Sequence, residues 1–432
     1  MDSIQAKAMR IVLGAMKSSP INCMRVECVE PPLSLRRQFL SDKFLFRCIQ
    51  FSNHILTPKL TYLASLIPNC SYWKNKRPPC LVESYRRFTC FEAPHQATSN
   101  PLFKYSYDSL VISPDIDTST GLVKIEQNQK LTFNYIVDTK WPQWHRIFTD
   151  ASKRSKDGCV GVGVLHSNYN IVQKTKLPPE SSVFTGECIG LVKAIEYILL
   201  LKLQKTVIFT DSLSSLNALA RFLFGSHYQF PVISEIRNLL LKCIKENYSV
   251  SFAWVPGHCG ISGNEKADRL ANEAVESGDV DIFRNYAHDL MSLSGIYLRN
   301  SWTEPWAQDS SKGRHYRTIQ PSIPSKPWFW KLRFSKKVTT VLSRMRLGHV
   351  CTPAHLTKLN INDSPTCDCG YDVGDLNHII FVCPRRDRSA LLEGLISIQI
   401  PFPSSISCLL STLDPHVYNL LAAFILSNNI KI

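Results

Sequence analysis

The spacing of apolar residues changes along the chain, and each spacing predicts a different kind of element. Near the N-terminus Ile4, Ala8 and Ala15 recur at helical intervals, which predicts a helix that ends before Pro20. Farther along, short apolar runs separated by tight turns replace the helical pattern, and these runs are typical of strands. The chain therefore begins with helices and continues into a region that contains a sheet.

Residues 145–278 carry the clearest pattern. Strands are predicted at 147–150, 159–165, 171–176, 206–209 and 250–255, and helices at 188–199, from 212, from 231 and at 264–276. Three strands in succession, followed by alternating helices and strands, indicate a mixed sheet with helices packed against it. The fold class predicted for this region is α/β, with a five-stranded mixed sheet and flanking helices.

The remaining sequence suggests further divisions. We expect a helical segment at 1–65 and a partly ordered linker at 66–144, followed by the α/β domain at 145–278. After it we expect a basic aromatic-rich helical connector at 279–360, and a Cys/His module with an apolar helix at 361–432.

Charge points to a polyanionic partner. The chain has 50 Lys and Arg against 35 Asp and Glu, a net charge of +15, and a hydrophobic content of 44%. Such an excess favours phosphate backbones, because each phosphate that is neutralised releases condensed counterions. The alternative is that dispersed lysines keep the protein soluble.

Cysteine usage and hydropathy indicate an intracellular protein. The 15 cysteines are an odd number, and the first 20 residues lack the basic start and apolar core of a secretory leader. No apolar run reaches the 18 residues of a membrane span. We therefore expect reduced thiols, a location in the nucleus or cytoplasm and no membrane partner, whereas the oligomeric state is not indicated.

Four acidic residues stand at the ends of predicted strands or the starts of predicted helices: Asp150, Glu187, Asp211 and Asp268. Phosphodiester hydrolysis needs an activated water and stabilisation of the leaving oxygen, and two metal ions about 3.5–4 Å apart can supply both. Mg²⁺ takes oxygen ligands, so carboxylates that converge at one edge of the sheet would suit it. Each acid alone would be read as a helix cap or a surface group.

The strings around these acids resemble type 1 ribonuclease H. They are FTDASK, TGEC, FTDSLSSLNAL and WVPGHCGISGNEKADRLANEA, and the last is the most specific. The resemblance implies a ribonuclease H-like fold and cleavage of the RNA strand of RNA–DNA hybrids, leaving 5′-phosphate and 3′-hydroxyl ends. It implies that the four carboxylates bind two Mg²⁺ ions, with Mn²⁺ as a substitute. It also implies that His258 assists proton transfer or product release, and that the hybrid backbone contacts Ser152, Ser212 and Asn264.

The sequence departs from the family pattern at two blocks. Ala151 follows the first Asp where the family usually has Gly, and a methyl group there would crowd the backbone near the substrate. Gly186 and Cys188 flank Glu187, where better helix formers are expected. Neither departure removes a metal ligand, but the Ala151 change, the 15 cysteines and the absence of a polymerase motif leave open an alternative in which the chain is a remnant that binds nucleic acid without cutting it.

Both flanks resemble non-LTR retrotransposon reverse transcriptases. The stretch from Arg10 to Phe44 is similar to the segment between their polymerase and ribonuclease H, but no YADD or FADD polymerase motif occurs, so DNA synthesis is not expected. The C-terminal pattern C-x-C-x8-H-x4-C resembles the Cys/His element of those proteins. Its thiolates and imidazole suit Zn²⁺ in a structural or nucleic-acid-gripping role, with ordinary buried thiols as the alternative. The four residues are Cys367, Cys369, His378 and Cys383.

Overall fold

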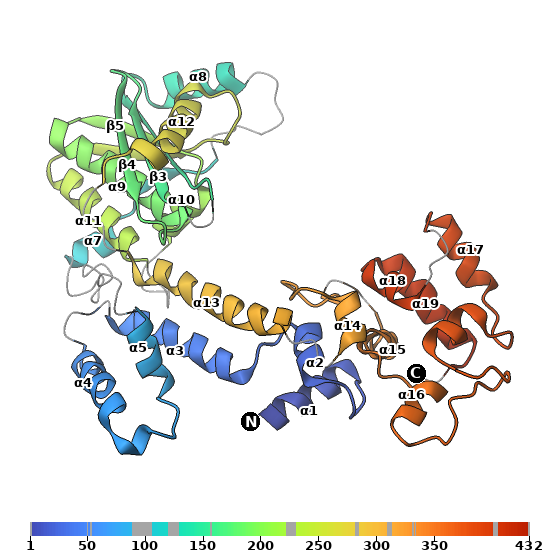
Figure 1. Ribbon diagram of the computed structural model, residues 1–432. Coiled ribbons are helices and arrows are strands. Elements are labelled where there is room, and N and C mark those ends of the chain that lie inside the picture. The colour runs from blue at the N-terminus through green and yellow to red at the C-terminus, as the bar shows by residue number, and fades with distance from the viewer. Residues whose placement is uncertain are drawn as a thin grey trace. The chain divides into compact units, whose positions relative to one another are not determined.

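The structure is a computed structural model of the 432-residue chain (Figure 1). It describes residues 2–49, 51, 54–88, 106–119, 129–155, 158–221, 230–280, 285–308, 313–330, 332, 334–400 and 405–430. Contacts divide the chain into two compact units: residues 40–295 form one, and residues 1–39 together with 296–432 form the other. This division differs from the five predicted segments, because the two ends of the chain share one unit.

Within the residues that the structure describes, a mixed sheet of six strands forms the centre of the 40–295 unit. Its order is β1-β6-β5-β2-β3-β4. Strands β1, β6, β5 and β2 are mutually parallel, and β2, β3 and β4 form an antiparallel meander. The strands are β1 Asp115–Asp117, β2 His145–Ser152, β3 Val160–His166, β4 Ile171–Leu177, β5 Lys205–Thr210 and β6 Ser249–Trp254. The α/β prediction is confirmed.

The sheet has one strand more than predicted. The extra strand, β1, pairs with β6 from Asp115↔Ser251 to Asp117↔Ala253, and it lies in the segment expected to be a linker. Three residues with the sequence Asp-Ile-Asp are too short to show an alternating pattern, so their strand comes from pairing with β6 rather than from local propensity. The same segment contains the last turn of α4 Leu56–Asn69 and the further helices η1 Ser71–Trp73, α5 Cys80–Phe88, α7 Tyr107–Val111 and α8 Gln129–Lys140.

Helices cover both faces of the sheet (Figure 1). One face packs against α9 Val183–Leu201, α10 Leu213–Ala220 and α11 Pro231–Lys245; the other packs against α8 and α12 Ser262–Ser277. Helix α12 lies very close to β3. A Cβ on Gly161 would lie 2.1 Å from the Ala271 carbonyl oxygen, and one on Gly163 would lie 2.5 Å from that of Ala267. Glycine facing alanine therefore brings α12, which carries Asp268, against the sheet.

A buried arginine attaches the segment before the sheet to α11. The Arg237 guanidinium donates to the carbonyls of Ser109, Leu110, Ile112 and Leu219 at 2.6–3.2 Å, and the residue is 2% exposed. Burial lowers the pKa of Arg237. Carbonyl oxygens thus satisfy this desolvated cation, and they fix α7 and the residue that follows it, Ile112, on the α/β domain.

The other unit is built from both ends of the chain. Its elements are α1 Asp2–Leu13, α2 Ile21–Cys28, the start of α3 Leu33–Ile49, the end of α13 Ala287–Gln308, α14 Arg314–Ile319, α15 Lys336–Leu347, α16 Pro353–Lys358, η4 His378–Val382, α17 Ser389–Ser397, α18 Ile406–Ser411 and α19 Pro415–Ser427. Glu27 on α2 and Arg346 on α15 form an ion pair at 3.0 Å, with both side chains 1% exposed. Arg346 also donates to Leu410 and Tyr418, so this buried network ties the N-terminal helices to the C-terminal ones.

One apolar core joins the predicted connector to the predicted Cys/His module. Leu342 and Met345 of α15 cluster with Leu376 and Ile380, and with α17, α18 and α19. The two predicted segments therefore fold around a common core.

Among the described residues, no helix is both long enough and apolar enough to span a membrane.

Candidate active site

Three of the predicted carboxylates meet at the carboxyl ends of the parallel strands. Asp150 lies on β2, Asp211 directly follows β5, and Glu187 lies in the second turn of α9. Each offers one carboxylate oxygen, and these atoms lie within 4.8 Å of one another. Asp150 and Glu187 are buried, and Asp211 is half-buried.

Asp268 and His258 lie beside this group. Asp268 is in α12, and its Oδ1 accepts a hydrogen bond of 2.9 Å from Asn272, one turn later on the same helix. Its Oδ2 lies 3.9 Å from His258 Nδ1. The His258 side chain is 82% exposed, and its backbone has φ +56. The fourth carboxylate is thus held by a helix, whereas the histidine projects from a loop into solvent.

Electrostatics at this site oppose the charged form of each acid in the group of three. Burial, followed by the charge of Asp211, raises the pKa of Asp150 to about 7. Burial and the charges of Asp150 and Asp211 raise the pKa of Glu187 well above its ordinary value. Burial also raises the pKa of Asp211, against a hydrogen bond from Asn264 and the charge of His258. Desolvated carboxylates so close together favour either shared protons or a bound cation.

The donor set fits a hard divalent cation. All ligand atoms of the group are carboxylate oxygens, and Glu187 Oε2 is a buried oxygen with no hydrogen-bond partner in the described structure. A buried acceptor without a donor is costly, and a metal ion at this point would satisfy it. Asp150, Glu187 and Asp211 would hold such an ion, with Asp268 close by.

Two residues of the β6–α12 region position Asp211, and the sequence did not mark them for this role. The Trp254 indole N–H donates to the Asp211 carbonyl at 3.1 Å. A Cβ at Gly257 would lie 2.5 Å from Asp211 Oδ2, so only glycine lets the loop come this close to the carboxylate. Asn272 was also missed, although its spacing of four residues from Asp268 was a readable signal.

Comparison with known proteins agrees with this geometry. The RNase H family model matches residues 143–276. Proteins named Ribonuclease H from Francisella tularensis subsp. novicida and Francisella philomiragia are each 31% identical to this chain over 136 residues, which is 30% of this chain and 88% of theirs. The chain belongs to the ribonuclease H family. The remaining residues lie outside the matched region.

The residues expected to contact the substrate backbone are already engaged within the ribonuclease H domain. Ser152 Oγ donates to Asn272 at 2.8 Å. The Ser212 hydroxyl lies 2.8 Å from that of Ser215, and Asn264, which is 2% exposed, hydrogen-bonds to Asp211. Substrate contact by Ser152, Ser212 and Asn264 stays a prediction, and the structure gives Asn264 a role in holding a carboxylate.

The two departures from the family pattern lie against each other. A Cβ on Gly186 would be 2.8 Å from the Ala151 Cβ and 2.6 Å from Val160 Cγ1. Ala151 is 9% exposed and belongs to the core under α9. The Ala151 methyl group therefore packs against α9, where Gly186 leaves room for it, so the glycine in the helix compensates for the alanine in the strand.

This complementarity gives a stability prediction. Gly186→Ala, which would normally favour a helix by up to about 1 kcal/mol, should here destabilise the protein by about 1–3 kcal/mol through overpacking. Adding Ala151→Gly should recover part of the loss and give a coupling energy above about 0.5 kcal/mol in a double-mutant cycle. Denaturant unfolding of the wild type, both single variants and the double variant measures it.

Gly295→Ala is the matched control for this cycle. Gly295 also lies within a helix, α13, but a Cβ there would meet no atom within 4 Å. This variant should be neutral or slightly stabilising. Strictly additive effects at positions 151 and 186 would contradict the proposed compensation.

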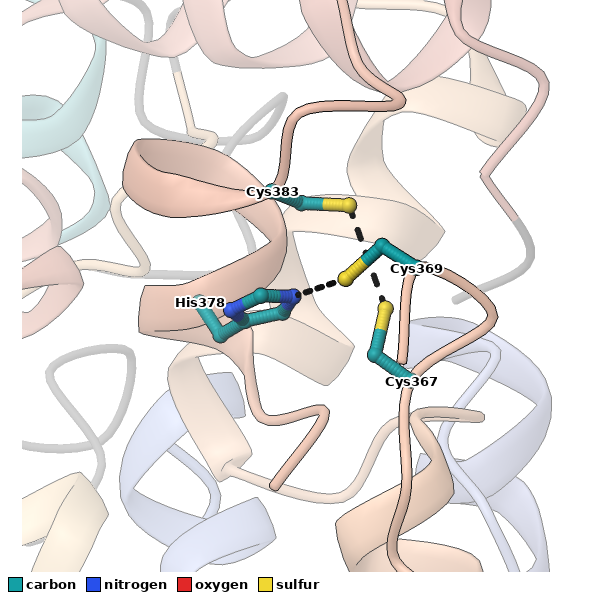
Figure 2. Close-up of side chains that lie close together, drawn as sticks. All are labelled: Cys367, Cys369, His378 and Cys383. Atoms are coloured by element: carbon teal, nitrogen blue, oxygen red, sulfur yellow. Dashed lines mark hydrogen bonds between the residues drawn. The ribbon is translucent and has the colours of Figure 1, made fainter. Parts of the chain in front are cut away.

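The Cys/His residues form a second cluster, in the unit that contains the C-terminus. Figure 2 shows Cys367 and Cys369 on one loop facing His378 and Cys383 at the two ends of η4. One ligand atom from each of the four lies within 4.8 Å of the others. The two buried sulfurs, of Cys367 and Cys383, are 3.8 Å apart, and Cys369 Sγ is 3.2 Å from His378 Nε2.

These distances fit tetrahedral zinc. Zn–S bonds of about 2.3 Å separate two thiolate sulfurs by about 3.8 Å in a tetrahedron. The imidazole is held in place, because the Tyr371 ring stacks on His378 at 4.4 Å between centroids and 5° between planes. The loop turns at Gly370, whose φ is +90, a conformation that glycine adopts without strain. Cys367, Cys369, His378 and Cys383 would therefore hold Zn²⁺ with no coordination position left for a reaction.

Proposed function

We propose that this protein is an endonuclease that hydrolyses the RNA strand of RNA–DNA hybrids. The observation that carries the proposal is the meeting of Asp150, Glu187 and Asp211, with oxygens within 4.8 Å, inside a domain of the ribonuclease H family. The relatives named Ribonuclease H support the same reaction class. The net charge of +15 suits a nucleic-acid partner.

Two divalent ions, Mg²⁺ or Mn²⁺, would supply an activated water and stabilise the departing 3′ oxygen. The protein would hold them through Asp150, Glu187, Asp211 and Asp268. Trp254 holds the Asp211 backbone, the absence of a side chain at Gly257 leaves room for the Asp211 carboxylate, and Asn272 orients Asp268.

His258 would move a proton to or from the reacting oxygens. Its exposed side chain, on a loop between Gly257 and Gly260, has the freedom to approach a bound substrate and to withdraw with product. The ribose 2′-hydroxyl would distinguish the RNA strand from DNA.

The Cys/His cluster would be a structural zinc site. Leu376 and Ile380, between its ligands in sequence, belong to the core shared by α15, α17 and α19. Metal binding would therefore stabilise this unit by closing its 367–383 segment. Together with the N-terminal resemblance, the cluster supports an origin of the whole polypeptide in a non-LTR retrotransposon.

Cleavage of a labelled hybrid by the full-length protein tests the nuclease proposal. With Mg²⁺ the RNA strand should be cut to 5′-phosphate products, whereas RNA–RNA and DNA–DNA duplexes of the same sequence remain intact. Glu187→Gln should lower the rate by on the order of 1,000-fold or more, because it removes a metal ligand. Glu196→Gln, an exposed acid on the same helix, is the matched control and should cut normally.

The same assay distinguishes the enzyme from a binding remnant. Retention of the hybrid on the wild-type protein without cleavage, at any Mg²⁺ or Mn²⁺ concentration, would refute the nuclease and favour the remnant.

A further inference from the structure

The first turn of α9 lacks part of its usual capping arrangement. Ser182 is the N-cap, and its hydroxyl accepts from the Thr185 N–H at 3.2 Å. In a capping box the third helical residue is Glu or Gln, whose side chain accepts from the N-cap N–H in return. Here that residue is Thr185, which carries no carboxylate, so the chain must supply the missing acceptor from elsewhere.

Asp289, in the first turn of α13, supplies a carboxylate at this point. The Thr185 hydroxyl donates to Asp289 Oδ2 at 2.7 Å, and Asp289 is 3% exposed. Burial raises the pKa of Asp289, and hydrogen bonds from Thr185 and from the backbone and hydroxyl of Ser182 oppose that shift. The capping box of α9 is thus completed by a residue 104 positions away from Thr185 in sequence. A negative charge at a helix N-terminus is also favourable to the helix dipole.

A neighbouring residue holds the turn that leads into α9. Asn285 Oδ1 accepts from the Ser181 hydroxyl at 3.1 Å, and its Nδ2 donates to Glu180 at 3.2 Å. Residues 285–289 therefore bind both the turn before α9 and its first helical residues. All of these contacts lie within the 40–295 unit.

The first turn of α9 leads directly into the second turn, which carries the metal-site carboxylate of Glu187. Glu187 lies two residues after Thr185, and burial and like charge both oppose its ionised form beside Asp150 and Asp211. Its carboxylate interacts with the Ala151 backbone and the Asp150 side chain, but its Oε2 has no hydrogen-bond partner in the described structure, so the position of that oxygen depends strongly on the helix. Repulsion within the site would push the start of α9 away from β2, and a shift of about 1 Å is enough to spoil a metal site.

We propose that Asp289 is a positioning residue for the metal-binding carboxylate of Glu187, and that it acts through the first turn of α9. The inference rests on the proposed function, because it assumes that Glu187 is a metal ligand. It also places a determinant of metal binding 13 residues beyond the region that matches the family model, which ends at residue 276.

Metal affinity of the full-length protein tests this role. Mn²⁺ is the probe because it prefers the oxygen ligands of the carboxylate site over the Cys/His cluster. Isothermal titration calorimetry should show 10- to 100-fold weaker Mn²⁺ binding for Asp289→Ala. Losses of this size are typical when a residue that orients a metal ligand, without binding the metal itself, is removed. Asp289→Asn keeps an acceptor for Thr185 and should lose less. Cleavage by Asp289→Ala should approach the wild-type rate as the metal concentration is raised.

Two further variants separate positioning from general stability. Tyr286→Phe removes a hydrogen bond of 3.2 Å from the same segment to Glu235 on α11, and it should leave Mn²⁺ affinity unchanged. Thr185→Val removes the hydroxyl that donates to Asp289, and it should weaken Mn²⁺ binding even if Asp289→Ala does not fold. If both Asp289→Asn and Thr185→Val bind Mn²⁺ as tightly as the wild type, the positioning role is wrong, whereas the proposed nuclease function is unaffected. Absence of Mn²⁺ binding by the wild type would overturn the carboxylate site itself, and the positioning role with it.

Discussion

Asp150→Asn will make the metal-free protein more stable at neutral pH, although it abolishes hybrid cleavage. Asp150 is 6% exposed, and burial and the charge of Asp211 raise its pKa to about 7. Asparagine keeps the side-chain oxygen that accepts from the Ala151 N–H at 2.7 Å, but it brings no charge. The substitution therefore removes a buried charge and its repulsion by Asp211, while it preserves packing.

The pH window follows from the sign of the shift. An unfolded Asp releases its proton near pH 3.9, whereas folded Asp150 keeps it up to about pH 7. The folded state binds more protons in between, so its stability falls as the pH rises from about 4 to 7 and then stays low. Asp150→Asn should flatten this fall and gain about 2–4 kcal/mol at pH 8 without metal.

Scanning calorimetry at several pH values, on protein made with zinc and kept free of added Mg²⁺ and Mn²⁺, measures the effect, and addition of Mg²⁺ should reduce the difference by stabilising the wild type. Asp138→Asn is the control, because the Asp138 side chain is 68% exposed and pairs with Arg146 on the surface. An unfolding temperature of Asp150→Asn that lies below that of the wild type at pH 8 without added Mg²⁺ or Mn²⁺ would contradict the proposed cost of the buried charge.

The part of the site that could be predicted from sequence is the part built from local signals. Asp150 and Asp211 each stand at the end of an apolar run, and parallel strands bring such ends to one edge of a sheet. Their spacing within recognisable blocks then suggested a metal site. The Cys/His cluster was also predictable, because its four residues lie close together in the sequence, within 367–383.

The residues that support the site could not be predicted in this way. Asp289 meets Thr185 across 104 positions, and although Thr185 opens the TGEC block, Asp289 lies in no motif. Ala151 and Gly186 each look unfavourable alone, and only their contact shows that one compensates for the other. Strand β1 was missed because its three residues become a strand only by pairing with β6. Tertiary contacts determine all of these features, and hydrophobic periodicity does not reveal such contacts.

Zinc removal will loosen the unit that contains the C-terminus and leave the ribonuclease H domain folded. Full-length protein made with zinc present should contain one Zn²⁺ per chain that excess Mg²⁺ does not displace, because Mg²⁺ binds thiolate and imidazole poorly. Cys383→Ser should lose this ion. Cys383 is fully buried, and its sulfur lies 3.8 Å from that of Cys367, so the substitution removes a zinc ligand on the buried side of the cluster.

The expected damage extends beyond the ligands because Leu376 and Ile380 pack with α15, α17 and α19. Hydrogen exchange should therefore rise in residues 367–400 and in α19 after Cys383→Ser, with a destabilisation of about 3 kcal/mol or more, while strands β2–β6 exchange as before. Cys408→Ser, at an exposed cysteine of the same unit, is the matched control and should retain both zinc and protection. Zinc content and mass-spectrometric exchange measure the outcome. Equal protection from hydrogen exchange with and without zinc would mean that the apolar core alone stabilises this segment. The Cys/His cluster would then not be a structural zinc site.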